Sequence, residues 1–471
     1  TLSDITVGLD QSLSLIYGIE LAAEMANLNI VDTSLKGAAR VKSLGKVVKN
    51  NNDWTVSSES AEIEITGPDS NWASADSLLN NFNYQLSLSG TELVDVSLAG
   101  QQRIVGLTTK PQNNSALQAR ELETEWQATR SGDKVWEIKL KNNVPELSVA
   151  QIKLSKLSNT SNITIATDST LQLIGQSEIQ NAAYTDKKFT KLRFEHDVKT
   201  QREPAKNSAA MNVLGKHQLQ LGSGLNVQIG HTGENFNITV KEQAVTTVQK
   251  LLNQFNTKIQ LVAGTFSANL SGSLSSANYS GNLQVANASL KYDDFQLLFL
   301  QLDEGFMLNS AGIQLNSGKI TIDELDVGIP IRQIELHVDI VDSVAKLELA
   351  QGNLVGGTFK VTDLWLDNRK QLTNISVSGL DLADFVALQK QQGIKVTGEM
   401  SGILPFQLGA TDAIIEHGLL VNDGPGKLRI QNNSAFDAIK DQQKELSFLQ
   451  NVEYRKLSSK VELASDGWLD L

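Results

Sequence analysis

The sequence has no cysteine and few prolines or aromatic residues. The absence of Cys excludes disulfides, zinc–thiolate sites, iron–sulfur clusters and Cys nucleophiles, and it leaves the redox compartment open. Its 7 prolines compare with about 24 at the average frequency, which fits a chain made almost entirely of sheet, since Pro cannot donate to a strand ladder. Aromatic residues make up 6%, so the apolar surface must be mainly Leu, Ile and Val.

Basic residues and long apolar runs are also in short supply. The 41 Lys and Arg against 53 Asp and Glu give a net charge of −12, which disfavours a nucleic-acid surface. Apolar stretches such as Leu297–Leu300 fall far below the ~18 residues of a membrane-spanning helix. The first residues lack a basic region followed by an apolar one, so they do not predict a signal peptide. A hydrophobic content of 40% with 20% charged residues is typical of a folded protein.

Apolar and polar residues alternate along nearly the whole chain. Ile63 and Ile65 alternate with acidic residues, and the longest such run includes Ile334, Leu336, Val338 and Ile340. Gly, Asn, Ser and Asp separate these segments and mark turns. Strict alternation gives each strand one polar face towards solvent and one apolar face, here called the dry face, which is typical of antiparallel sheets.

A few short amphipathic helices interrupt this pattern. The spacing predicts helices over 245–256, over 381–392 with Asp381 as N-cap, after Ser434, and more weakly over 74–82. The resulting division is an N-terminal part of the sheet over 1–244 with several exposed loops, the helix 245–256, a second part over 257–433, and a terminal helix and strand over 434–471. Both ends lie within alternating stretches, which predicts that the chain is a portion of a longer protein.

No motif for catalysis, metal binding or cofactor binding is present. The five His residues are spread along the sequence without metal-ligand spacing, which favours surface or turn positions. Gly222–Gly224 lacks the third Gly of a dinucleotide loop, and Gly426-Lys427 lacks the Ser or Thr of a phosphate-binding loop. Acidic pairs such as Asp303-Glu304 fit solvated turns. We therefore predict a protein that is not an enzyme and has no metal or cofactor.

The dry faces of the strands can be hidden in two ways. In a closed sandwich or barrel two sheets bury each other, and composition alone favours this solution. The alternative is a long, strongly curved sheet whose dry faces line a trough for acyl chains. That arrangement needs aliphatic side chains, few aromatics, few buried charges and few crossover helices, and all four are present.

Residues from about 320 to 435 resemble the YdbH family of AsmA-like bacterial envelope proteins. The matching stretches are GNLVGGTF (352–359), VSGLDLADFVAL (377–388), GIKVTGEMSGILPFQL (393–408) and IIEHGLLVNDGPGKLRI (414–430), with LDVGIPIRQIEL (325–336) more particular to YdbH. Before residue 245 only the succession of strands agrees. The resemblance implies an all-β fold, an elongated and strongly curved antiparallel sheet that forms a hydrophobic groove.

The same resemblance implies a function and partners. Such proteins carry phospholipid along the groove between the inner and outer membranes, so this chain would be a periplasmic portion. In the full-length protein a helix missing from this chain would anchor it in the inner membrane, and a small outer-membrane lipoprotein would add strands at the C-terminal edge. The alternative function is a structural envelope scaffold or adhesin-like protein with a closed core and no ligand. Neither the lipid carrier nor the scaffold is expected to bind nucleic acid.

The predicted lining of the groove consists of apolar members of the alternating strands in the second half. These residues are Ile334, Leu336, Val338, Leu347, Leu349, Phe359, Val361, Ile375, Val377, Ile394, Val396, Leu419, Val421, Leu428 and Ile430.

Overall fold

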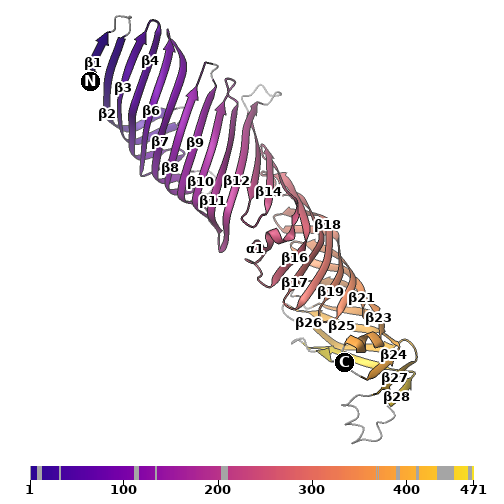
Figure 1. The fold of residues 1–471 in the computed structure, drawn as a ribbon. Helices are drawn as coiled ribbons and strands as arrows, with labels where there is room; N and C mark the ends of the chain where they lie inside the picture. The colour runs from indigo at the N-terminus through magenta and orange to yellow at the C-terminus, as the bar shows by residue number, and fades with distance from the viewer. Residues whose placement is uncertain are drawn as a thin grey trace. The chain divides into compact units, whose positions relative to one another are not determined.

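In a computed structural model the described residues of the chain are almost entirely strand (Figure 1). The structure describes residues 2–7, 13–30, 33–110, 116–132, 135–202, 211–367, 369, 371–388, 393–409, 413–431, 450–464 and 469–470. They form 30 strands, two short α-helices and one 3-10 helix. Within these ranges no helix is long and apolar enough to cross a membrane. The predicted all-β fold built on a long antiparallel sheet is confirmed.

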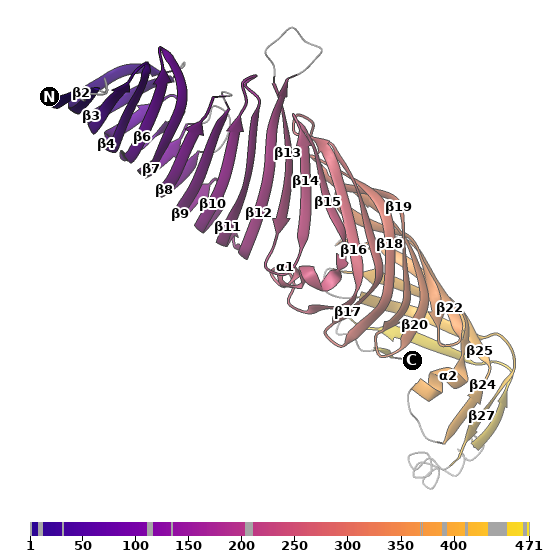
Figure 2. The same cartoon turned by 45° about the horizontal axis from the view of Figure 1, so that its top comes forward.

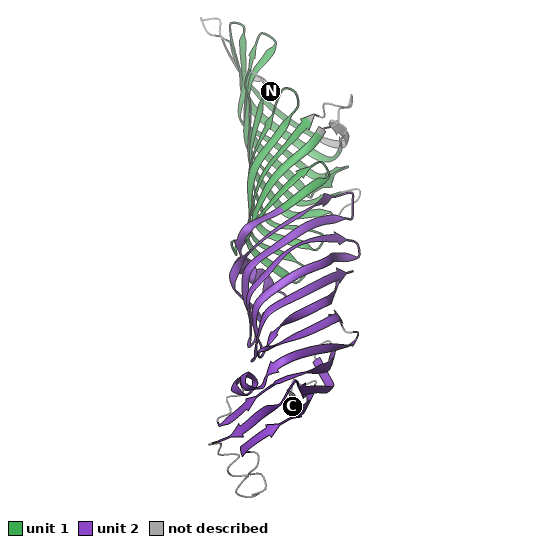
Figure 3. Ribbon diagram, turned by 90° about the vertical axis from the view of Figure 1, so that its right-hand side faces the viewer, with its two compact units in different colours: residues 1–238 green, residues 239–471 purple. Residues whose placement is uncertain are grey.

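The chain divides into two compact units, residues 1–238 and 239–471 (Figure 3). We call them unit 1 and unit 2. Strand β15 (Asn235–Ala244) contains the boundary, and the predicted divider at 245–256 lies directly after this strand.

Unit 1 is an antiparallel sheet in which strands pair in chain order from β1 to β14, except that β4 pairs with β6 and the short β5 pairs with β4 and β7. Its strands are β1 (Leu2–Val7), β2 (Leu13–Ile30), β3 (Thr33–Asn50), β4 (Asp53–Ser70), β5 (Ala73–Ser74), β6 (Ser77–Ser89), β7 (Glu92–Thr109), β8 (Leu117–Arg130), β9 (Trp136–Val149), β10 (Ile152–Ile165), β11 (Leu171–Tyr184), β12 (Lys187–Arg202), β13 (Met211–Gln220) and β14 (Asn226–Thr232).

Unit 2 continues the same plan from β16 to β23, followed by β25, β26, β29 and β30 (Figure 2). Strands β24, β27 and β28 form a separate three-stranded sheet. The bounds are β16 (Ile259–Ser273), β17 (Tyr279–Tyr292), β18 (Phe295–Asn309), β19 (Gly312–Asp326), β20 (Pro330–Val341), β21 (Val344–Leu354), β22 (Gly357–Trp365), β23 (Leu372–Asp381), β24 (Ile394–Thr397), β25 (Glu399–Leu408), β26 (Ala413–Asn422), β27 (Gly426–Ile430), β28 (Asn451–Tyr454), β29 (Ser458–Leu463) and β30 (Leu469–Asp470).

The helix predicted over 245–256 is shorter than the sequence predicts, and the one predicted over 381–392 is described only as far as residue 388. The 245–256 segment contains a 3-10 helix, η1 (Val245–Val248), and α1 (Gln249–Leu252). Helix α2 (Leu382–Leu388) begins after Asp381, whose carboxylate accepts hydrogen bonds from the backbone N–H groups of Ala383 and Asp384 at 2.6 and 3.2 Å. The predicted N-cap is therefore confirmed. The helix predicted after Ser434 lies outside the described residues.

The helix predicted over 74–82 is wrong. Residues from Ser77 onward belong to β6, where Leu78 lies opposite Ile65 and Phe82 opposite Ala61. The segment has apolar residues at both helical and alternating spacings. Pairing with β4 decides between them, because it satisfies the backbone and places Leu78 and Phe82 beside apolar partners.

Bulges bend the strands of each unit, and Figure 3 shows the resulting curvature within each sheet. The register shifts between Ser58 and Ala61 of β4 in unit 1, and in unit 2 it shifts around Asn287, Gln333 and His417, whose φ is positive. A bulge places two residues opposite one, bends the strand and shifts the alternation of its side chains by one position. This shift decides which residues share a face in the site below.

As far as the structure describes them, the sheets do not close over a conventional core. The chain exposes 29237 Å² of surface, whereas two globular proteins of half its mass would expose about 21,000 Å² together. In the described part of the chain no large hydrophobic side chain is fully buried. These values favour single-layer sheets over the closed sandwich.

Candidate functional site

One face of each sheet is less exposed than the other, and we call it the inner face. In unit 2 the inner face is mainly aliphatic. The strand register places six residues side by side across β19 to β25, in the order Ile320, Leu336, Ala350, Val361, Ile375 and Leu404. Ala350, Val361 and Leu364 form one buried cluster on this face.

A second buried cluster lies on the inner face further along unit 2. Val377, Leu380, Met400, Ile415, Leu420 and Val461 form it, with exposures between 3 and 9%. Strands β23, β25, β26 and β29 contribute these residues. Each strand supplies only one or two of them, so the apolar surface exists only when the strands are paired.

Eight of the fifteen predicted lining residues share the inner face of unit 2. They are Ile334, Leu336, Val338, Leu347, Phe359, Val361, Ile375 and Val377, which the register connects laterally through β20, β21, β22 and β23. Ile334, Val338, Val361 and Val377 are buried, while the others are partly exposed. That any of them contacts lipid stays a prediction.

Leu349 lies on the opposite face because of a bulge in β21. Val338 pairs with Leu347, but Leu336 pairs with Ala350, so one extra residue is inserted between these two inner positions. Leu349 instead lies opposite His337 and Thr362. The inward residue after the bulge is Ala350.

A second bulge moves Leu419 and Val421 off the inner face. The register of β26 shifts between Ile415 and Gly418, where His417 has a φ of 59°. Continued alternation from Ile415 predicts Leu419 inside, but Leu420 occupies that side at 8% exposure, while Leu419 is 48% exposed.

The last four predicted residues belong to the three-stranded sheet. Ile394 pairs with Ile430 and Val396 pairs with Leu428, so the four share one face as the alternation predicts. Leu428 also pairs with Val452 of β28. These strands form a sheet distinct from the large one, so the register does not connect the four residues to its inner face.

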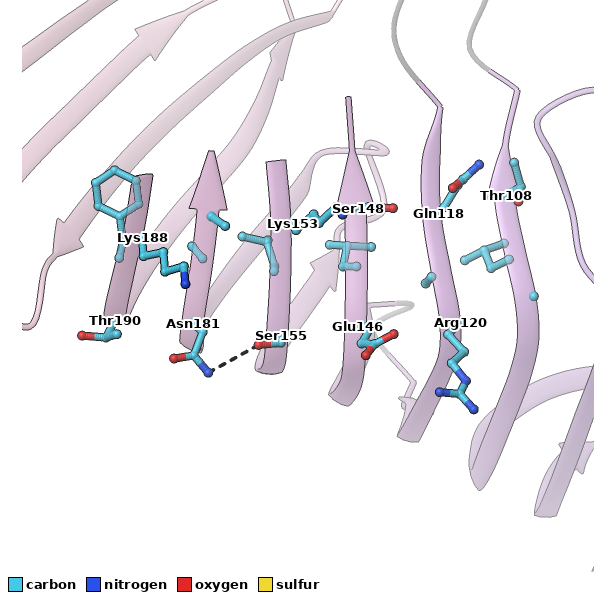
Figure 4. A pocket seen from close by; sticks show the side chains of 18 residues that line it. Thr108, Gln118, Arg120, Glu146, Ser148, Lys153, Ser155, Asn181, Lys188 and Thr190 are labelled. Carbon is cyan, nitrogen blue, oxygen red and sulfur yellow. Dashed lines mark hydrogen bonds between the residues drawn. The ribbon is translucent and has the colours of Figure 1, made fainter. Parts of the chain in front are cut away.

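Unit 1 carries an elongated hollow that sequence analysis does not identify. It has a volume of about 960 Å³ and is lined by three consecutive residues from each of the six strands β7 to β12 (Figure 4). The middle residues form one lateral row, Leu107, Ala119, Leu147, Leu154, Ala182 and Phe189. Charged residues including Arg120, Glu146 and Lys188 flank this row.

The centre of the inner face of unit 1 is polar. A lateral row of uncharged side chains crosses β6 to β11, and we call it the polar seam. Its members, in register order, are Asn80, Gln102, Thr124, Asn142, Asn159 and Ser177.

Several seam residues hydrogen-bond to one another. Thr124 Oγ1 donates to Asn142 Oδ1 at 2.8 Å, and Asn142 Nδ2 donates to Asn159 Oδ1 at 3.0 Å. Asn159 Nδ2 then donates to Ser177 Oγ at 2.9 Å. Such mutual bonding is what allows polar groups on a half-buried face. The sequence places Asn142 at the same alternating spacing as Ile138 and Leu140, but a search for apolar residues passes over it.

Three of the five histidines lie together on the inner face of unit 1, which corrects their predicted surface or turn positions. His196 lies opposite His217 in the register, and the His217 and His231 rings stack with centroids 5.3 Å apart. Burial lowers the pKa of His196, and burial followed by the neighbouring histidines lowers the pKa of His217. In the described part of the chain no group of His, Asp or Glu is arranged to hold a metal ion.

The family model that matches this sequence agrees with the architecture. It is the YdbH-like model, described as intermembrane phospholipid transport protein YdbH, and it matches residues 3–471, including the first half where the motifs give little support. No curated protein matches the sequence significantly. The chain belongs to the YdbH-like family of intermembrane phospholipid transport proteins.

Proposed function

We propose that the chain carries phospholipids with their acyl chains against the inner faces of its sheets, in the periplasm between the inner and outer membranes. One observation carries the proposal: the apolar inner face of unit 2 belongs to a single-layer sheet. The exposed area of 29237 Å², far above that of globular proteins of this mass, argues that no second sheet among the described residues covers it.

The chemistry of this face suits acyl chains. Its central row is aliphatic from Ile320 to Leu404. This row runs across the strands, so an acyl chain that lies along the row contacts no charged side chain. Charged groups gather on the opposite face, where Glu335 accepts hydrogen bonds from Lys319 and His337 at 2.7 and 2.8 Å. Hydrocarbon bound to the inner face would remove apolar surface from water, and this burial would favour binding by about 25 cal/mol per Å².

The wider setting follows from the family resemblance. In the full-length protein we propose an inner-membrane anchor, and a small outer-membrane lipoprotein that pairs with the C-terminal edge of the sheet. Addition of a strand to a sheet edge provides main-chain hydrogen bonds without requiring a preformed pocket.

Site-specific photo-crosslinking in cells tests the acyl-binding face. A photoreactive residue at Leu336, on the inner face, should form adducts with phospholipid that mass spectrometry identifies. The matched control is Ile403, an apolar residue on the opposite face that is 54% exposed. Equal labelling at both positions, or no lipid at Leu336, would contradict the proposal.

A further inference from the structure

The polar seam has hydrogen-bonding capacity beyond its internal bonds. In the described part of the chain the Gln102 side-chain amide has no hydrogen-bond partner, and Asn142 uses one of its two side-chain N–H groups. Asn80 accepts a bond from Trp126 Nε1 at 3.0 Å, which leaves its own N–H groups available. The Ser177 hydroxyl accepts from Asn159 and keeps its proton for another acceptor. The seam therefore offers mainly donors.

The direction of the internal bonds reinforces this excess of donors. Thr124, Asn142 and Asn159 each donate to the next strand, and Ser161 Oγ also donates to Asn159 Oδ1 at 2.9 Å. The Asn159 carbonyl oxygen thus receives two bonds. Bonds aligned head to tail polarise one another, which strengthens the donors that remain.

The seam carries no charge and lies between apolar positions. Val144, Leu157 and Ile179 lie on one side of the seam, two residues along their strands from the seam residues. Ile138 and Ile163 lie on the other side, further from the seam. A ligand group that fits must accept hydrogen bonds, remain neutral and be joined to hydrocarbon. A phosphate does not meet this description, because an anion on a half-buried face needs a cationic partner.

We propose that the polar seam binds the ester carbonyls of diacyl glycerophospholipids, whose acyl chains lie on the apolar positions at either side. This inference rests on the proposed function and specifies the part of the lipid that unit 1 recognises. Neighbouring strands are about 4.8 Å apart, so the seam provides a series of closely spaced donors along which a lipid can exchange partners.

The test compares two lipid probes with the full chain. Dioleoyl phosphatidylethanolamine and its dioleyl diether analogue share headgroup and chain length, but the diether lacks both carbonyl oxygens. Purified protein is equilibrated with vesicles containing equal amounts of both, and bound lipid is quantified by mass spectrometry. We expect enrichment of the diester by about fivefold, the effect of one net hydrogen bond.

Two seam variants and one control locate the preference. Asn142→Leu and Gln102→Leu should each bring the ratio of diester to diether towards one. Gln102→Leu breaks no internal hydrogen bond, so it remains informative if Asn142→Leu impairs folding, which circular dichroism would reveal. The control is Asn143→Leu, on the same strand, whose side chain lies on the exposed face and contacts Glu123 at 3.4 Å. It should keep the preference.

The outcomes separate this inference from the proposed function. Equal binding of both lipids by the unmodified chain, or a preference that survives in Gln102→Leu, overturns the role of the seam while lipid binding stands. Binding of neither lipid overturns the proposed function and the seam proposal together.

Discussion

The centre of the inner face is a line of amides and hydroxyls in unit 1, from Asn80 to Ser177, whereas the row from Ile320 to Leu404 in unit 2 is aliphatic throughout. Both units use the same architecture of long antiparallel strands bent by bulges. Both described clusters of buried hydrophobic residues nevertheless lie in unit 2. In unit 1 the buried hydrophobics include several alanines, such as Ala61 and Ala119.

The two units show that one fold can be stabilised in two ways. A single-layer sheet has no opposing layer, so its inner face must be stabilised within itself. Unit 2 uses lateral contacts between aliphatic side chains, and unit 1 adds side-chain hydrogen bonds between neighbouring strands. We therefore expect unit 2 to respond most to changes in packing, and unit 1 to changes in hydrogen bonding and protonation.

The largest effect is expected when a charge enters the apolar cluster of unit 2. Val377, at 4% exposure, lies in that cluster, and a carboxylate there would lack a partner. Val377→Asp should therefore lower the free energy of unfolding by several kcal/mol. Ser376→Asp, one residue away on the exposed face, should change it by no more than about 0.5 kcal/mol. Thermal unfolding followed by circular dichroism measures both, and equal effects would contradict the assignment of faces.

A cavity in the same cluster is expected to have a smaller effect. Leu420→Ala removes a side chain that is 8% exposed and should cost about 2–5 kcal/mol of unfolding free energy. The adjacent Leu419→Ala, at a side chain 48% exposed, should cost about 0.5 kcal/mol or less. Urea unfolding of the two variants measures the difference. A larger cost at Leu419 would mean that the bulge at His417 does not shift the alternation.

This pair also shows how far the sequence predicts the site. Alternation predicts strands correctly, because period 2 persists through Ile334 to Ile340 and its equivalents elsewhere. Alternation fails to predict the faces beyond a bulge, because one extra residue moves every later side chain in that strand to the opposite face. Leu349, Leu419 and Val421 all follow such bulges, and nothing in their local sequence indicates the extra residue.

Unit 1 shows the opposite limitation. Its seam residues occupy positions where alternation calls for apolar side chains, so a search for apolar periodicity passes over them. Asn142 and Asn159 become interpretable only once the register places them side by side. The histidines are similar, because His196 and His217 are 21 positions apart in the sequence and opposite each other in the sheet.

The smallest expected effect concerns pH and distinguishes the two units. Burial lowers the pKa of His196 and His217 below the ordinary 6.5, so the folded state disfavours their protonation. The unfolded chain takes up these protons first as pH falls. The stability associated with neutral histidines is therefore fully present above pH 6.5 and is lost as pH falls through the lowered folded-state pKa.

In unit 2 the pH range over which a protonation change lowers stability lies lower. Hydrogen bonds from Lys319 and then His337 lower the pKa of Glu335 from 4.5 to about 2, and that contribution is lost only as pH falls below 4.5. Hydrogen exchange, corrected for its intrinsic pH dependence, should thus show less protection at pH 5.5 than at pH 7.5 in β12–β14, but not in β19–β20. His196→Gln combined with His217→Gln should remove the change in β12–β14. A uniform loss of protection in both units, or an unaltered response in the double variant, would show that these histidines do not set the difference.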